Sequence, residues 1–102
     1  MVLIRHIVSW NFKEEFTAEE NKNHALKIKK DLEALKEKIP GIISIEVIVD
    51  LLPGSNHDIA LYSLFESEHA LAAYQPHPEH VKVSNWIGTV VKNRACIDFV
   101  EK

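Results

Sequence analysis

The fold is decided by IISIEVIVDLLPGSNHDIALYSLFE, residues 42–66, where two runs rich in β-branched and aromatic residues flank a turn-forming segment. We predict strands over 42–50 and 58–66, because Ile, Val and Tyr favour extended backbone. The segment 51–57 between them contains Pro, Gly, Ser and Asn and is predicted to be a loop. The two strands should therefore pair as an antiparallel hairpin.

Both faces of this hairpin carry apolar side chains. Alternation places Ile43, Ile45, Val47 and Val49 on one face, and Ile42, Ile48, Ala60, Tyr62 and Leu64 on the other. Each such side chain left in water forgoes about 1.5–3 kcal/mol of burial, so a second apolar face indicates an interface. A second copy of the chain is the simplest cover, because a twofold dimer needs one self-complementary surface. The alternative is a monomer whose own loops cover this face.

The residues before the hairpin predict a strand and a long helix. Residues 2–12 form a strand in which one face carries Ile4, His6, Val8, Trp10 and Phe12. A helix is predicted over 17–38, because Thr17 and Glu20 have the spacing of a capping box. Its apolar stripe consists of Ala25, Ile28, Leu32, Leu35 and Ile39. Pro40 and Gly41 should end it.

The residues after the hairpin predict two more helices and a last strand. Ser67 is expected to cap a short helix through Tyr74, and Pro78 to begin another that runs to Val91. A strand over 94–100 completes the set. This order of elements is that of the split βαβ unit. We therefore predict one α+β domain over 1–102, a ferredoxin-like four-stranded antiparallel sheet with helices on one face.

Composition excludes several classes of function. A formal net charge of -3, with both signs interspersed, offers no positive field for nucleic acid. The lone cysteine, Cys96, rules out an intrachain disulfide and favours the cytoplasm. The apolar run 2–10 is interrupted by Arg5 and His6, which argues against a signal peptide and a membrane span. We expect a soluble, cytoplasmic protein.

The candidate chemical groups are histidines, a tyrosine and a carboxylate. In His77-Pro78-Glu79-His80, Pro78 at the first helical position places His77 at the cap and His80 in the first turn. Near the positive end of a helix, His80 tends to stay neutral and could accept a proton. His6 and Asp98 lie on strands expected to be neighbours, so the carboxylate could orient an imidazole.

Each candidate also has a purely structural interpretation. His6 could be a hydrogen-bonded core residue, and His77 a cap alone. Tyr74 could be a core aromatic, and Asp98 could pair with Arg5 or a backbone amide. His77 and His80 lack further metal ligands, because His57 and His69 fit no zinc spacing and the only thiol is Cys96. With no glycine-rich phosphate loop either, we expect neither a metal nor a cofactor.

Four segments form a pattern along the chain: Ile4-Arg5-His6-Ile7-Val8, Ile39-Pro40-Gly41-Ile42, Tyr74 to His80, and Ile97-Asp98-Phe99. Together they resemble the stress-responsive α/β-barrel (Dabb) domain family over nearly the whole chain. The resemblance implies a dimeric α+β barrel in which two ferredoxin-like sheets pack together, and this agrees with the apolar second face. The expected partner is thus a second copy, bound through the open sheet face.

The resemblance also implies roles for residues. One plant polyketide cyclase of this family closes a ring by an aldol-type step without a cofactor, using a histidine in the position of His80. By that likeness, His80 would remove a proton alpha to a carbonyl and Asp98 would hold its ring. His6 and Tyr74 would place the oxygen atoms of the substrate.

Three functions follow as hypotheses. The first is a dimeric protein that binds a small organic ligand in a cavity lined by His6, Tyr74 and His80. The second is a cofactor-free cyclase, lyase or isomerase that uses His80 as general base in the same cavity. The third is a structural, stress-protective dimer without catalysis, for which a filled interior would speak.

Overall fold

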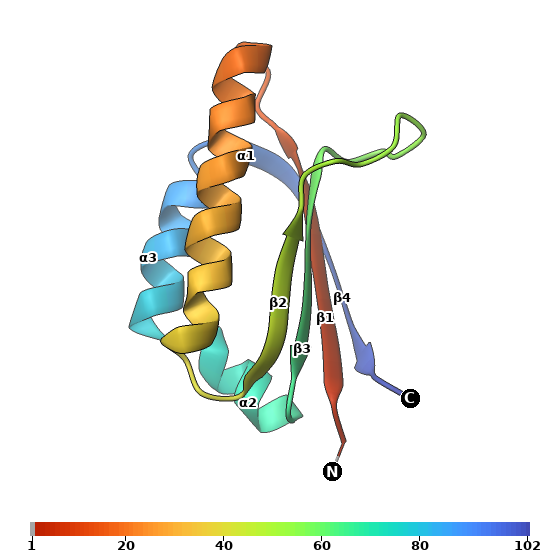
Figure 1. Cartoon of the computed structure of the whole chain (residues 1–102), viewed down its shortest axis with the longest axis vertical. Helices are drawn as coiled ribbons and strands as arrows, with labels where there is room; N and C mark the ends of the chain where they lie inside the picture. The colour runs from red at the N-terminus through yellow and green to blue at the C-terminus, as the bar shows by residue number, and fades with distance from the viewer. Residues whose placement is uncertain (1) are drawn as a thin grey trace.

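A four-stranded antiparallel sheet carries the helices on one of its faces (Figure 1). The computed structural model describes residues 2–102, and Met1 lies outside the described residues. The elements are β1 (Ile4–Phe12), α1 (Ala18–Glu33), the 3-10 helix η1 (Ala34–Glu37), β2 (Ile42–Ile48), β3 (Ile59–Phe65), α2 (Glu68–Tyr74), α3 (Pro78–Ile87) and β4 (Val91–Val100). The strand order β2-β3-β1-β4 confirms the predicted ferredoxin-like fold.

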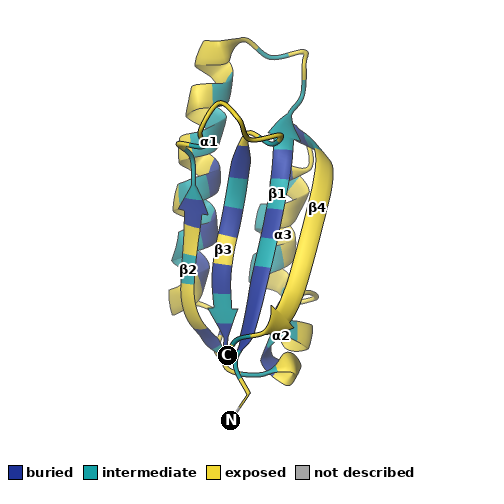
Figure 2. Cartoon of the chain, turned by 90° about the vertical axis from the view of Figure 1, so that its right-hand side faces the viewer, coloured by how far each residue is buried: buried dark blue, intermediate teal, exposed yellow. Residues whose placement is uncertain are grey.

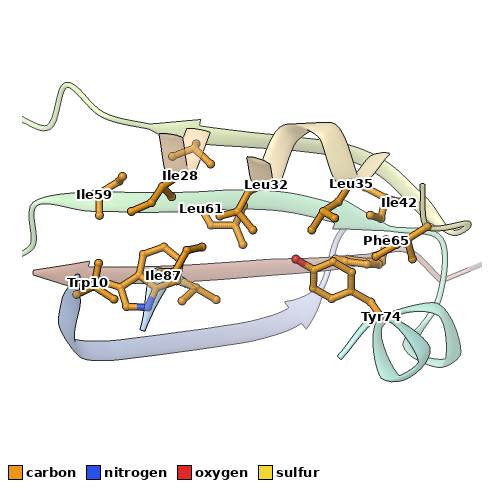
Figure 3. Packing of buried hydrophobic residues seen from close by; sticks show 14 of the residues in the cluster. Trp10, Ile28, Leu32, Leu35, Ile42, Ile59, Leu61, Phe65, Tyr74 and Ile87 are labelled. Carbon is orange, nitrogen blue, oxygen red and sulfur yellow. The ribbon is translucent and has the colours of Figure 1, made fainter. Parts of the chain in front are cut away.

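The core lies between the sheet and the helices (Figure 3). Ile28, Leu32 and Leu35 of the predicted helical stripe are fully buried there against β-strand residues such as Leu61 and Phe65. The helix begins as predicted, because the Thr17 side chain accepts from the Glu20 amide and the Glu20 side chain accepts from the Thr17 amide. The stripe thus supplies the helical half of the core.

The turn after the long helix requires glycine. Gly41 has φ +94°, and a Cβ placed there would lie 2.6 Å from the Cβ of Ala70. A side chain would therefore meet both a strained backbone and a packed neighbour. The left-handed turn expected at Gly41 is confirmed, while the helix changes from α to 3-10 geometry after Glu33 and ends at Glu37, before Pro40.

The last helix is shorter than predicted. It ends at Ile87 and not at Val91, because Gly88 is followed by the β-branched Thr89, Val90 and Val91. The backbone of this segment pairs with β1: the Val90 carbonyl accepts from the Lys13 amide at 3.0 Å, and Val91 lies opposite Phe12. The last strand therefore begins at Val91, three positions before the predicted start. The other three strands are each slightly shorter than predicted.

A register shift in β2 corrects the expected faces of the hairpin. The pairing moves from Ile42 opposite Phe65 to Ser44 opposite Leu64, which leaves Ile43 as an extra residue. Ile42 is therefore 8% exposed on the helix side and Ile43 is 40% exposed on the other side. The sequence alternation predicted the reverse for these two residues, because it assumed an unbroken pairing.

The face without helices, which is turned toward the viewer in Figure 2, carries exposed apolar side chains, as predicted. Tyr62, Ile97 and Phe99 project from it and are each more than 40% exposed. The Arg5 guanidinium lies 4.2 Å from the centre of the Tyr62 ring and pairs with Glu101. The alternative in which Asp98 pairs with Arg5 is therefore wrong. Within residues 2–102, no helix has the length and apolar character that a membrane crossing requires.

Candidate functional site

A cavity of about 360 Å³ lies between α3 and the part of the sheet formed by β1 and β4. His6 on β1 and His80 on α3 both line it. Its other walls combine apolar and polar side chains: Val8, Trp10, Leu32, Leu61, Ile87 and Val91, with Gln75, Ser84, Lys92, Asn93 and Arg94. The two histidines, which lie 74 positions apart in the chain, therefore face a common space.

His6 is held by the strand next to it. The antiparallel register places His6 directly opposite Asp98, on the side of the sheet that faces the helices. The Nδ1–H of His6 donates to Asp98 Oδ1, and the imidazole is only 2% exposed. The backbone is fixed as well, since the Ser63 hydroxyl donates to the His6 carbonyl at 2.8 Å. The expected neighbourhood of His6 and Asp98 is confirmed.

His80 is held by the loop before its helix. His77 is the N-cap, as predicted, and its Nδ1 accepts from the Glu79 amide at 3.1 Å. The Nδ1–H of His80 donates to the Gln75 carbonyl at 2.9 Å, so Nε2 keeps its lone pair. Burial lowers the pKa of His80, and the nearby His6 lowers it further. His80 is thus a neutral imidazole with a free acceptor nitrogen.

Tyr74 connects the two histidines. Its ring is 1% exposed and lies 4.2 Å from the His80 ring and 6.2 Å from the His6 ring, centre to centre. Its hydroxyl points into the core (Figure 3) and has no hydrogen-bond partner among residues 2–102. Burial raises the pKa of Tyr74, so the group is a neutral phenol with a proton to donate. An unpartnered buried hydroxyl costs about 1–3 kcal/mol.

Sequence reasoning missed the basic end of the cavity. The β1–β4 register shifts between Ser9 and Asn11, and Asn93 in the extra stretch has φ +57°. This bulge brings Asn93 and Arg94 to the cavity wall. The alternation of side chains along β4 cannot show where the strand contains a bulge. The only local sign of the bulge was Asn93, because Asn adopts positive φ more readily than most residues.

One role implied by the resemblance has a different partner in the structure. The ring of His80 is held by the Gln75 carbonyl, while Asp98 contacts His6 and the Cys96 thiol. Asp98 does not line the histidine cavity but a second hollow of about 450 Å³, between α2 and the end of β4. The structure therefore brings the rings of His6, Tyr74 and His80 together and places Asp98 behind His6. Tyr74 was expected to line the cavity, but it is buried beside it and is not among the lining residues.

The fold agrees with comparisons to known proteins. Residues 4–101 match the family described as the stress responsive A/B barrel domain. The chain belongs to this Dabb family. A dimeric ferredoxin-like protein of unknown function from Bacteroides fragilis is 33% identical to this Dabb domain, with a TM-score of 0.89 over 97% of this chain and 96% of the other.

Two further solved structures resemble this Dabb domain. A dimeric ferredoxin-like protein of unknown function from Thermobifida fusca is 25% identical, with a TM-score of 0.81 over 98% of this chain and 92% of that one. A hydroxynitrile lyase from Passiflora edulis is 16% identical, with a TM-score of 0.79 over 98% of this chain and 94% of that one. This last likeness shows a shared fold only. Among curated proteins, none matches the sequence.

Proposed function

We propose that this Dabb protein binds a small organic ligand in the cavity between α3 and the sheet. The observation that carries the proposal is that His6 and His80, from distant parts of the chain, line the same space of about 360 Å³. Ligand pockets of about 300–1,000 Å³ with apolar walls and a few convergent polar groups are typical of small-molecule sites. A purely structural role would favour a filled interior here instead.

The polar groups also support catalysis by proton abstraction. His80 Nε2 would take a proton from the carbon next to a carbonyl, and the electrons of the broken C–H bond would move onto the carbonyl oxygen as an enolate. The neutral Tyr74 phenol, which has no hydrogen-bond partner among residues 2–102, would donate to that oxygen. His6 lines the same wall and would position the substrate, with Asp98 holding its ring.

We further propose that the protein is a homodimer formed through the open face of the sheet. Tyr62, Ile97 and Phe99 form an exposed apolar surface there, and similar solved proteins are dimeric. Such a dimer buries the face that no helix covers and leaves the histidine cavity on the opposite side of each sheet. A cytoplasmic setting suits the free thiol of Cys96.

Ligand binding can be tested through Trp10, which lines the cavity. In a Trp86→Phe background Trp10 is the one remaining tryptophan, and its fluorescence should change when anilinonaphthalene sulfonate or an aromatic ketone enters. Ser84→Phe should abolish this change by filling the cavity. Its matched control is Asn85→Phe, on the same helix but outside the lining, which should bind as before. Equal binding by both variants would place the ligand elsewhere.

Proton abstraction has its own test. Solvent deuterium exchange at the α-carbon of a ketone probe such as α-tetralone, followed by NMR, should be accelerated by the protein. His80→Ala should remove most of this acceleration, about 100-fold or more for a lost general base. The control His69→Ala changes an exposed histidine on α2 and should exchange at the rate of the unmodified protein. Equal rates for His80→Ala and the unmodified protein would remove His80 from the mechanism.

A further inference from the structure

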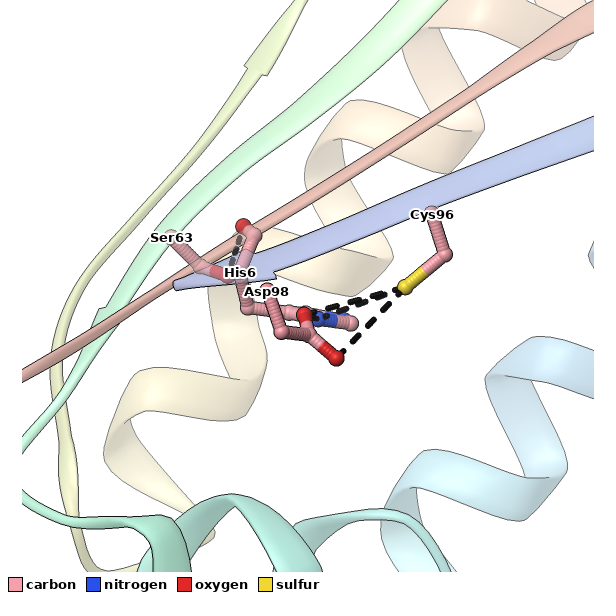
Figure 4. Close-up of polar contacts among 4 residues, drawn as sticks. All are labelled: His6, Ser63, Cys96 and Asp98. Atoms are coloured by element: carbon pink, nitrogen blue, oxygen red, sulfur yellow. Dashed lines mark hydrogen bonds and ion pairs between the residues drawn. The ribbon is translucent and has the colours of Figure 1, made fainter. Parts of the chain in front are cut away.

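Three potential metal ligands meet behind the histidine cavity, on the helix-facing side of β1 and β4 (Figure 4). They are His6 Nδ1, Cys96 Sγ and an Asp98 oxygen, and these atoms all lie within 4.8 Å of one another. The thiol sulfur is 3.9 Å from His6 Nδ1 and 3.7 Å from each Asp98 oxygen. Asp98 is opposite His6, and Cys96 is two residues earlier on the same strand.

We propose that His6, Cys96 and Asp98 form a binding site for Zn²⁺ or a similar divalent transition metal. Tetrahedral zinc, with a Zn–S distance of about 2.3 Å and a Zn–N distance of about 2.0 Å, places sulfur and nitrogen about 3.5 Å apart. The observed separation of 3.9 Å needs only a few tenths of an ångström of adjustment. Imidazole, thiolate and carboxylate are all ligands that zinc accepts.

The hydrogen bonds in this cluster show what a cation would replace. The Nδ1–H of His6 and the Cys96 thiol both donate toward the Asp98 carboxylate, so two hydrogen bonds now hold the three side chains together. On metal binding the Cys96 thiol would lose its proton and the His6 proton would move from Nδ1 to Nε2, which leaves a neutral imidazole, a thiolate and a carboxylate. Their two negative charges match one divalent ion, one proton is released, and the same three side chains stay in place.

The scaffold around these ligands is rigid on one side and open on the other. His6 is almost fully buried on a central strand, and its backbone carbonyl is anchored by Ser63. Cys96 and Asp98 lie on the exposed edge strand, which gives an ion a path from solvent. Three protein ligands leave a fourth position free, as in zinc sites that also bind water or an anion.

Arg94 is the charged residue next to the proposed metal site. Burial and Asp98 raise the pKa of the Cys96 thiol, and Arg94, two residues earlier on the same strand, offsets only part of that rise. Its positive charge opposes a bare cation but favours the thiolate and an anionic fourth ligand. The spacing argument from sequence missed this site because His6 is 90 residues away from Cys96, and strand pairing alone brings them together.

Cobalt provides a direct test that does not depend on any activity. Untagged, reduced protein titrated with Co²⁺ should show a thiolate-to-cobalt charge-transfer band and the absorption of tetrahedral cobalt, and Zn²⁺ should displace both. Because Cys96 is the only cysteine, the charge-transfer band reports on this residue alone. Cys96→Ser should abolish the band, and His6→Gln and Asp98→Asn should each weaken Zn²⁺ binding about tenfold or more.

The controls separate this site from other histidines and from misfolding. His69→Gln, on the exposed surface of α2, should bind cobalt like the unmodified protein. Circular dichroism checks that the buried His6→Gln variant remains folded, while the exposed Cys96→Ser and Asp98→Asn variants provide the test without that risk. Absence of the charge-transfer band in the unmodified protein, or equal Zn²⁺ affinity after Cys96→Ser, would overturn the proposal. Neither result bears on ligand binding in the cavity.

Discussion

The two halves of the sheet are covered very differently. Over β2 and β3, α1 and η1 pack closely, and the side chains between these helices and the sheet are almost inaccessible to water, as for Leu35 and Phe65. Over β1 and β4, α3 stands over a cavity, and eight of the ten residues of β4 are exposed. We call these the filled half and the hollow half, and Figure 2 shows β4 of the hollow half exposed along most of its length. The filled half supplies stability, and the hollow half holds the polar groups that could perform chemistry.

The sharpest way to test this division is to remove a side chain from the filled half. Leu35→Ala should lower the free energy of unfolding by about 2–5 kcal/mol, because it leaves a void where no solvent enters. Urea denaturation at a fixed protein concentration measures this, since a dimer makes the midpoint depend on concentration. The control is Leu26→Ala in α1, where the side chain is 55% exposed, and it should change stability by about 0.5 kcal/mol or less. Similar losses of stability for both variants would contradict the conclusion that burial in the filled half supplies the stability.

A substitution next to the cavity of the hollow half should raise the stability of the protein, where Leu35→Ala lowers it. Tyr74→Phe removes a buried hydroxyl that has no partner among the described residues, so the variant should be more stable by about 1 kcal/mol. Deuterium exchange into the ketone probe should slow in the same variant, because the enolate oxygen loses its donor. Tyr62→Phe on the open face is the control and should leave exchange unchanged. A less stable Tyr74→Phe would show that the hydroxyl has a partner in solution.

The smallest expected effect is the pH dependence caused by His80. Because burial lowers the pKa of His80 below 6.5 in the folded protein, the unfolded state binds the proton more readily. Stability from this group is present above about pH 6.5 and declines as the pH falls through the lower, folded-state value. His80 is only partly buried, so the effect is small. The difference in urea midpoint between the unmodified protein and His80→Gln, followed from pH 8 to pH 5, should shrink toward acid. A difference that stays constant would place His80 in water.

Much of the filled half could be predicted from sequence. The stripe Ile28, Leu32, Leu35 and Ile39 repeats at helical spacing, and each of the four is buried as predicted. Thr17 and Ser67 act through bonds to residues three positions away, and Gly41 acts through its own backbone angle, so their roles also follow from local pattern. The error in this half is the assignment of Ile42 and Ile43 to the wrong faces of the sheet. Alternation cannot show that β2 contains one residue more than the paired part of β3 at this point.

The hollow half could be predicted only in part. Residue types and strand adjacency indicated His6, His80 and Asp98, but the partner of each ring depends on distances that sequence spacing does not contain. Asp98 contacts His6, and the Gln75 carbonyl, five residues before His80, holds the other ring. Arg94 reaches the cavity through a bulge, and Cys96 joins His6 and Asp98 only because β4 pairs with β1.

By itself, the sequence determined the order of the elements, the apolar stripe of the long helix and the two apolar faces of the sheet, because each depends on a repeat of two or about 3.6 residues along one chain. The tertiary structure decided the register, the cavity and the contacts among His6, Cys96 and Asp98. These depend on hydrogen bonds between strands some 90 residues apart, and one extra residue in either strand changes which side chains meet.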